Sequence, residues 1–545
     1  MTISAAVTQN ITCSGGICVP TGGDAVLNSD DLESMLASGN VTVTTTGSGV
    51  QANDIEVSAE FSWPGANALT LDAYKSVEID RTVSVRGVGG VSVLTNDGGT
   101  GGEFAFGGKG RLRFANLSDS LTINGAAYTL VRSVKGLARA IAANPAGDFA
   151  LAKNYDAGRD GTFVKPPIPT VFSGAFHGLG NKISNLTIND PTENSYVGLF
   201  AETASGASIA NLILANEAVT AASGSSMQSS QEFVGGVVGF GKGGAIANVS
   251  ASGSVSSGEY SVAGGLVGIG GDILSECRSG MSVSDGYLGE AGGLVGGTVA
   301  GASIAHSRST GNVSGSGFVG GLVGFNDEAL IEHSTAAGTV TGTDQDTDAG
   351  GLAGINEGVI AKSSASGGVA CQAGCGGLVG WNGGGPSGVS TILQSYATGN
   401  VSGTGDGGGL VGFNSSSKVI DSYATGSVSG QGAGGLIDDN STGDTIVISR
   451  SYASGTVTAT QYAGGLIGYD QFAGSIKRTY WDLTTSGISS PSQGAGNISD
   501  DPGIKGLSNA KLQSRLPAGF DPRIWAENPA INGGLPYLLD NAPPR

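Results

Sequence analysis

Short apolar runs alternate with glycine-, serine- and asparagine-rich turns along most of the chain. In one stretch the runs fall at residues 409–413 (Gly-Leu-Val-Gly-Phe), 419–424 (Val-Ile-Asp-Ser-Tyr-Ala) and 426–429 (Gly-Ser-Val-Ser). Each run is too short for a helix and contains β-branched or aromatic residues, so each predicts a strand. Because alternate residues of a strand face the same side, we expect Leu410, Ile420 and Val428 to point into the core.

The same unit recurs nine times between about residues 233 and 470. It begins Gly-Gly-Leu-Val-Gly and ends near Ile-x-x-Ser-Tyr-Ala-Thr-Gly-x-Val-Ser-Gly. The first glycine of each pair stands at 235, 264, 292, 320, 350, 376, 408, 434 and 464. A period of this size indicates stacked repeats. Three strands per unit predict a triangular coil whose apolar side chains are covered by the neighbouring coils.

We therefore predict an all-β fold, a right-handed, three-sided parallel β-helix with short helical insertions and a C-terminal cap. The handedness follows from the general preference of crossover connections. Four segments are expected: irregular solenoid coils, a helix-containing junction with the first regular coils, the repeat solenoid and the capping segment, at 1–130, 131–232, 233–482 and 483–545. An N-cap pattern near residue 29 and apolar residues at helical spacing over 133–142 predict two helices.

Aligned copies of the repeat place like side chains in columns. One column holds Asn326, Asn356, Asn382 and Asn414, with Asp470 in the last copy. Asparagine suits left-handed turns, and stacked amides can hydrogen-bond along a column. A second column holds Tyr396, Tyr423 and Tyr452, continued by Tyr480. We interpret it as structural ring stacking, with an aromatic strip for sugars as the alternative.

Composition and charge exclude several classes of protein. Glycine makes up 98 of 545 residues, yet the period of three that collagen needs is absent, and 39% hydrophobic residues are too many for a disordered chain. The net charge of −19 gives no positive footprint for nucleic acid. The sequence contains no apolar run of about 18 residues, the length that would predict a membrane-spanning helix. Residues 1–20 carry no recognisable secretory signal.

The five cysteines form two close pairs and leave Cys277 over. Cys13 with Cys18, and Cys371 with Cys375, are expected to close small disulfide loops in an oxidising compartment. A zinc site is the alternative, but the pairs stand some 350 residues apart and the chain has only three histidines.

We find no catalytic set in the sequence, and expect no enzyme and no cofactor. His306 and His333 share one repeat position with Lys362, Gln394, Asp421 and Arg450, which is typical of an outward, solvated column. The clearest acidic cluster is Asp344, Asp346 and Asp348, a weak calcium candidate without the glycine and glutamate of a calcium loop. Asp438, Asp439 and Asp444 form a second group, which we interpret as an ordinary insertion at a repeat corner.

The Gly-Gly-Leu-Val-Gly units resemble the GLUG motif of large bacterial surface proteins. Residues 172–188 resemble the segment that introduces GLUG arrays in filamentous-haemagglutinin-like adhesins, and residues 475–482 with 533–537 resemble their end. The resemblance covers roughly residues 120–540. It implies a secreted β-helical adhesin, commonly exported by a two-partner system.

The leading hypothesis is thus a secreted, non-enzymatic adhesin or structural surface protein of a bacterium. Its expected partners are host, cell-surface or matrix glycans or proteins. A polysaccharide lyase or hydrolase on the same scaffold is one alternative, because parallel β-helices also carry such enzymes. A fibre subunit that associates end to end is the other.

Overall fold

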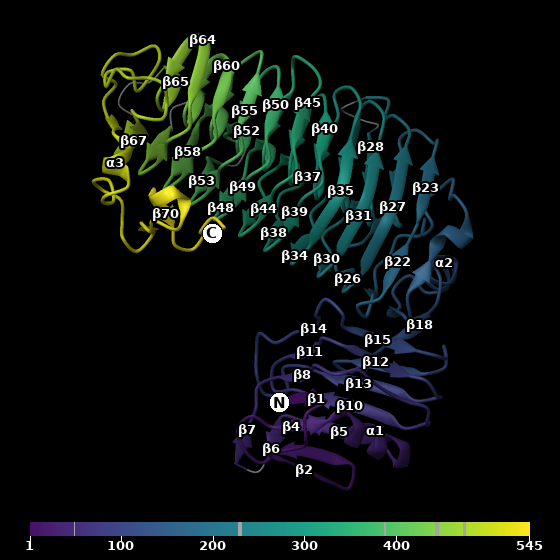
Figure 1. Ribbon diagram of the computed structural model, residues 1–545. Helices are drawn as coiled ribbons and strands as arrows, with labels where there is room; N and C mark the ends of the chain where they lie inside the picture. Colours follow the sequence, from purple (N-terminus) through teal and green to yellow (C-terminus); the bar gives the residue numbers. More distant parts are fainter. Residues whose placement is uncertain (48, 227–230, 386–387, 442–445, 472–475, 545) are drawn as a thin grey trace.

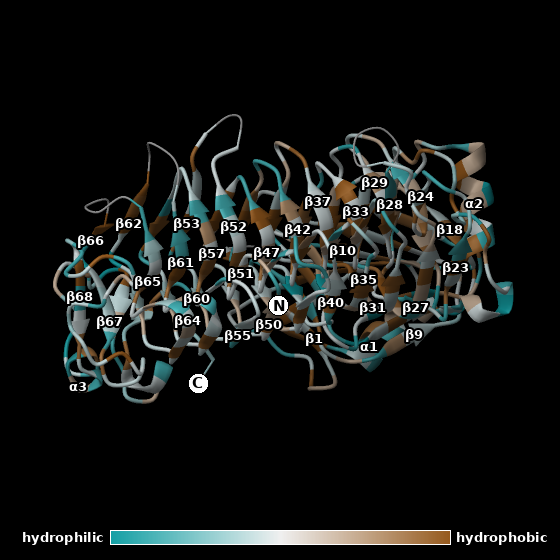
Figure 2. Cartoon of the chain, turned by 90° about the horizontal axis from the view of Figure 1, so that it is seen from above, coloured by the Kyte–Doolittle hydropathy of each residue, from teal (hydrophilic) through white to brown (hydrophobic). Residues whose placement is uncertain are grey.

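The chain forms parallel β-solenoids of about 16 turns with little helix, which confirms the predicted all-β parallel β-helix. The computed structural model describes residues 1–47, 49–226, 231–385, 388–441, 446–471 and 476–544. Figure 1 shows a short N-terminal solenoid (purple to blue) below the start of a longer one (blue to yellow). Seen from above, apolar residues recur along the strands of the long solenoid (Figure 2).

The N-terminal solenoid consists of three sheets that surround one core. Helix α1 (Ser29–Ser38) is capped by Asn28 and buries Leu32 and Leu36 in that core. An antiparallel pair, β2 (Ile11–Ser14) with β3 (Ile17–Pro20), lies at one edge of the seven-stranded sheet. In sheet order, the five-stranded sheet consists of β14 (Phe104–Phe106), β11 (Val77–Ile79), β8 (Ile55–Val57), β1 (Thr2–Ser4) and β4 (Val26–Asn28). The seven-stranded sheet consists of β17 (Ala126–Ala127), β16 (Ser120–Ile123), β13 (Gly90–Leu94), β10 (Ala68–Asp72), β5 (Val41–Thr44), β3 (Ile17–Pro20) and β2 (Ile11–Ser14). The three-stranded sheet consists of β15 (Arg111–Phe114), β12 (Thr82–Val85) and β9 (Phe61–Trp63).

The long solenoid has three sheets, of 13, 28 and 10 strands. The 28-stranded sheet runs from β20 (Tyr155–Asp156) to β68 (Ile504–Leu507). The 13-stranded sheet contains β18 (Thr129–Val131), β19 (Phe149–Leu151), β21 (Ala175–His177), β26 (Ser208–Ala210), β30 (Ala245–Ala247), β34 (Ile273–Ser275), β38 (Ser303–Ala305), β43 (Leu330–Glu332), β48 (Val359–Ala361), β53 (Ser390–Leu393), β58 (Ser417–Ile420), β62 (Val447–Ser449) and β66 (Ile476–Lys477). The 10-stranded sheet contains β25 (Phe200–Thr203), β29 (Val238–Gly241), β33 (Val267–Gly270), β37 (Val295–Thr298), β42 (Val323–Asn326), β47 (Ala353–Asn356), β52 (Val379–Gly383), β57 (Val411–Ser415), β61 (Ile437–Asn440) and β65 (Ile467–Asp470).

One predicted strand is two strands in the structure. The run 419–424 breaks at Asp421, whose φ of 49° turns the backbone between β58 and β59 (Tyr423–Ala424). The expectation that Ile420 points inward is wrong: Val419 is buried, whereas Ile420 is only half-buried. The other two expected core residues, Leu410 and Val428, are buried.

The paired glycines of the repeat allow close backbone approach. At the first glycine of all nine pairs, a Cβ atom would collide with the carbonyl oxygen three residues further on; in one coil these are Gly350 and Ala353. None of these nine glycines has a positive φ. Crowding, rather than a left-handed turn, is therefore the reason that the repeat needs glycine there.

The long solenoid is closed differently at its two ends. Helix α2 (Val134–Ala143) packs Val134, Leu137 and Ile141 onto the core beside the first coil. At the other end, β68 adds a parallel strand to β67 (Thr479–Asp482). After α3 (Asn509–Leu512) the chain turns back along the side of the solenoid, so the expected capping segment covers a flank as well as an end. No helix in the described part of the chain is long and apolar enough to span a membrane.

Candidate functional site

One corner of the long solenoid carries seven residue types over ten coils. This corner column follows the strands of the 13-stranded sheet, and each member has a positive φ of 47° to 57°. Outside glycine this left-handed conformation is uncommon and favours asparagine, aspartate and histidine. Because glutamate, glutamine, lysine and arginine also adopt it here, the corner accepts many types of side chain. The corner column consists of Asn211, Asn248, Glu276, His306, His333, Lys362, Gln394, Asp421, Arg450 and Arg478.

A ladder of buried hydroxyls holds the corner in place. The residue after each corner is a serine from Ser307 to Ser451, and its hydroxyl donates to the carbonyl two residues earlier, as Ser363 does to Ala361 at 2.8 Å. The same oxygen accepts from the backbone N–H of the preceding coil, as Ser363 does from Ser334 at 3.1 Å. The column is therefore a rigid support. Sequence reasoning missed this ladder, although the Ser of Ser-Tyr-Ala repeats visibly.

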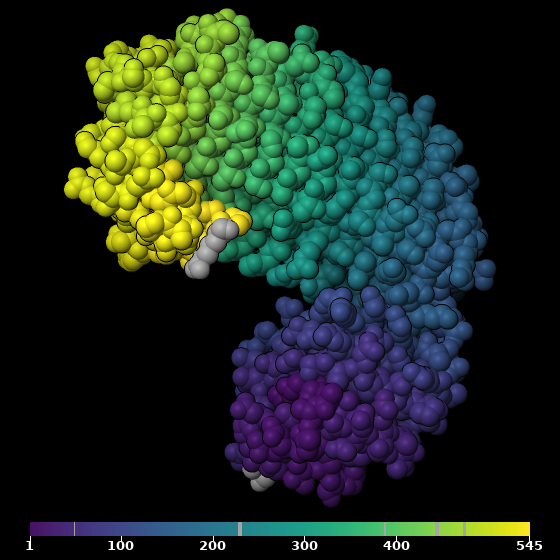
Figure 3. All heavy atoms as spheres, viewed as in Figure 1, coloured from purple at the N-terminus to yellow at the C-terminus, as the bar shows by residue number. Residues whose placement is uncertain are grey.

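Two segments outside the repeat each cover part of the corner column. The N-terminal solenoid covers the first coils: Asn211 donates to the carbonyl of Phe104 at 3.1 Å. The C-terminal segment covers the later coils, where Lys362 pairs with Asp540 at 3.0 Å and Trp525 donates to Asp421 at 3.0 Å. Figure 3 shows the resulting notch between the purple-to-blue body and the yellow segment.

Two histidines and two arginines lie in the part of the notch that neither the N-terminal solenoid nor the C-terminal segment covers. His306 and His333 stack on successive coils, with ring centroids 4.9 Å apart. Arg278 and Arg308 are exposed and occupy adjacent positions of one strand register. Neither arginine has an ion pair within the described residues. The expectation of an outward, solvated column holds at His306, which is exposed, but is wrong at Asp421, which Trp525 covers and buries.

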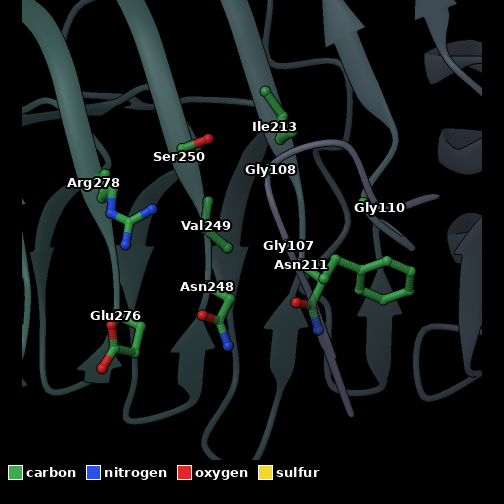
Figure 4. A pocket seen from close by; sticks show the side chains of 12 residues that line it. Gly107, Gly108, Gly110, Asn211, Ile213, Asn248, Val249, Ser250, Glu276 and Arg278 are labelled. Carbon is green, nitrogen blue, oxygen red and sulfur yellow. The ribbon is translucent and has the colours of Figure 1, made fainter. Parts of the chain in front are cut away.

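A pocket of about 150 Å³ opens where the two solenoids meet. The long solenoid contributes Asn248, Glu276 and Arg278, and the N-terminal solenoid contributes Phe106 with the glycine-rich loop that follows β14 (Figure 4). Asn211 lines the same pocket from the coil before Asn248. The walls therefore come from segments about 70 to 170 residues apart in sequence.

Buried contacts fix the joint behind this pocket. Leu112 and Phe114 of β15 donate backbone hydrogen bonds to Leu179 and Ala152 at 3.0 and 2.8 Å. His177 lies among Phe104, Phe106 and Tyr128, with its Nε2 atom 3.1 Å from the Asn211 amide nitrogen. Complete burial lowers the pKa of His177 to about 3, so the ring stays neutral and serves packing.

The structure brings the asparagine column together as a continuous amide ladder. Each amide nitrogen donates to the next oxygen at 2.7 to 3.0 Å, from Asn326 through Asn356, Asn382 and Asn414, and all four are fully buried. Asn440 is a further member, which donates to Asp470 at 2.7 Å. Sequence reasoning missed it because Ile437–Asn440 departs from the Leu-Val-Gly-aromatic pattern.

The tyrosine column is stacked and covered by protein. Rings of Tyr396, Tyr423 and Tyr452 lie 4.9 and 5.1 Å apart at 8° and 7°. Trp525 and Phe520 of the C-terminal segment pack against the column. With Tyr423 and Tyr452 fully buried, the column as it stands offers no open strip for sugars.

Both predicted cysteine pairs are bonded. Cys13–Cys18 joins β2 to β3 with Cα atoms 4.0 Å apart, and Cys371–Cys375 closes a turn with Cα atoms 5.8 Å apart. Cys277 stands in the hydroxyl-ladder position, and burial raises the pKa of its thiol to about 12.

The two acidic groups lie on different sheets. Asp344, Asp346 and Asp348 belong to the loop into β46 (Asp348–Gly350) of the 28-stranded sheet, where burial raises the pKa of Asp348 to about 6. Asp438 and Asp439 belong to β61 of the 10-stranded sheet, and burial raises the pKa of Asp438 to about 9; Asp444 lies outside the described residues. Among the described residues, no three His, Cys, Asp or Glu side chains gather as metal ligands.

Comparison with known families identifies one coil of the long solenoid. Residues 315–341, from the end of β40 (Val313–Gly315) to β45 (Val340–Gly342), match the model of the GLUG motif. The comparison with curated proteins finds no match. The long solenoid is therefore a GLUG-containing repeat region.

Proposed function

We propose that the protein is a secreted, non-enzymatic β-helical adhesin of a bacterial surface, of the filamentous-haemagglutinin-like type. The observation that carries this proposal is the corner column, a rigid row of variable side chains along a solenoid that contains a GLUG motif. Such a scaffold positions binding residues precisely while each coil stays supported by its neighbours. The two disulfides suit an oxidising, extracellular compartment.

Neither alternative has comparable support. A polysaccharide-cleaving enzyme needs carboxylates that converge with a base or cation, yet the two acidic groups lie on separate sheets and none of their described members has an ion pair. End-to-end fibre growth needs open strand edges. The antiparallel β2–β3 hairpin breaks the parallel stacking at one end of the seven-stranded sheet of the N-terminal solenoid.

Adhesion can be tested with the intact chain. Beads coated with the purified protein should attach to cultured epithelial cells or to extracellular matrix more than albumin-coated beads do, and soluble protein should compete. Antibodies against the chain should label intact cells of the source bacterium. Attachment no greater than with albumin, or glycan cleavage that a carboxylate substitution abolishes, would overturn the proposal.

A further inference from the structure

The pocket at the joint of the two solenoids collects polar side chains that have no partner among the described residues. Asn248, Glu276 and Arg278 line it from two successive coils, and none of the three side chains makes a hydrogen bond or ion pair with the described residues. Figure 4 shows Asn248 and Glu276 at the corners of neighbouring coils and Arg278 two residues beyond Glu276, at the start of β35 (Arg278–Ser284). Their backbones are tied to the next coil: the N–H of Asn248 donates to the carbonyl of Ser275 at 3.0 Å, and the N–H of Glu276 to that of Ala305 at 3.2 Å.

The chemistry of these groups defines the ligand. A guanidinium only donates hydrogen bonds, a carboxylate only accepts them, and an amide does both. A group that suits all three must offer donors and acceptors side by side, as the neighbouring hydroxyls of a sugar do. Phe106 supplies an apolar wall from the other solenoid, and an aromatic face suits the C–H face of a sugar ring.

The size of the pocket limits the ligand to one ring. Its volume of about 150 Å³ is below the roughly 300–1,000 Å³ of pockets that enclose drug-sized molecules. Its mouth adjoins the notch, where Arg308, His306 and His333 continue the exposed surface. A longer glycan can therefore leave one sugar in the pocket and pass along the notch.

We propose that this pocket binds a single sugar residue of a surface or matrix glycan, with Glu276 and Arg278 holding adjacent hydroxyls and Asn248 a third. The inference rests on the proposed adhesin function and names the class of ligand. The expected contacts are hydrogen bonds to charged groups, which are among the stronger ones in binding sites.

The test uses a glycan array probed with the intact chain, followed by calorimetric titration of the monosaccharide common to the hits. Glu276→Gln and Arg278→Gln should each weaken binding about tenfold or more, equivalent to about 1.4 kcal/mol. Two matched controls, Glu332→Gln and Arg139→Gln, change the same residue types outside the pocket lining and should alter affinity less than twofold. Circular dichroism must show unchanged folding in all four.

Three outcomes would overturn the inference: no binding of any sugar, equal effects of pocket and control substitutions, or preference for a free amino acid such as glycine, whose charges also fit a Glu–Arg pair. The bead assay separates these failures from failure of the adhesin proposal. Attachment that persists with Glu276→Gln and Arg278→Gln would leave adhesion standing and remove the pocket from it.

Discussion

The amide ladder has a direction, and one substitution tests it. Asn382 accepts from Asn356 at 2.8 Å and donates to Asn414 at 3.0 Å, with no exposed surface. In Asn382→Asp the new carboxylate still accepts from Asn356, but it faces the amide oxygen of Asn414 with no proton to donate. An unpaired buried charge of this kind costs about 3–5 kcal/mol.

Acid should repair the defect. A protonated carboxyl can donate to Asn414 as the amide did, so the folded-state pKa of the new group must lie above its unfolded value near 3.9. A carboxyl whose folded pKa is raised contributes full stability at low pH and loses it as pH rises through that value. The penalty relative to the parent should therefore be small near pH 4 and large at pH 7.

Hydrogen exchange followed by mass spectrometry measures this loss of stability in the coils around residue 382. Amides of residues 376–414 should exchange more than a hundredfold faster at pH 7 than in the parent, after correction for intrinsic rates, since each 1.4 kcal/mol is tenfold. Asn400→Asp is the matched control, because exposed Asn400 only accepts, from Ser427 at 3.0 Å. An equal penalty at pH 4 and pH 7, or none at either, would refute the directional ladder.

Three further substitutions probe the packing. Gly350→Ala places a methyl group against the carbonyl three residues on and should abolish soluble, folded yield by circular dichroism, whereas Gly388→Ala meets no atom within 4 Å and should fold. Trp525→Ala removes a buried ring from the tyrosine column and should cost about 3–5 kcal/mol locally, seen as rapid proteolysis of the C-terminal segment. Asp438→Asn should flatten the pH dependence of stability measured by urea unfolding. Because burial raises the pKa of Asp438 to about 9, this carboxyl keeps its proton in the folded protein and loses it on unfolding above pH 5. The free energy of unfolding of the parent should therefore fall by up to about 1.4 kcal/mol per pH unit between pH 5 and 8. A parent profile no steeper than that of the variant would contradict this.

The repeat could be predicted from sequence because each coil depends only on its neighbours. Glycine pairs, the asparagine column and the tyrosine column recur in every or nearly every late copy, so aligning the copies aligns the contacts. The error at Ile420 has a local cause. Counting alternate residues through the run 419–424 fails because Asp421 adopts a positive φ and restarts the alternation.

Contacts that do not repeat could not be found in this way. Trp525 reaches Asp421 across 104 residues, and no period relates the C-terminal segment to the column that it covers. The same is true of the pocket, in which Phe106 of one solenoid faces Glu276 of the other. The histidines of the corner column could be recognised from a variable position in the aligned copies of the repeat. The residues that face them across the notch could not be predicted in this way.

The place of the candidate site follows from the same physics. Within a regular solenoid every coil buries its core against identical neighbours, and the outer surface changes only by single side chains on a fixed backbone. A concave pocket needs two walls that face each other, which one stack of coils does not provide. It arises where the stack is interrupted, at the joint beside His177 and at the C-terminal segment that returns over Lys362. In a solenoid of this kind, the breaks in the repeat are therefore the first positions to search for a ligand site.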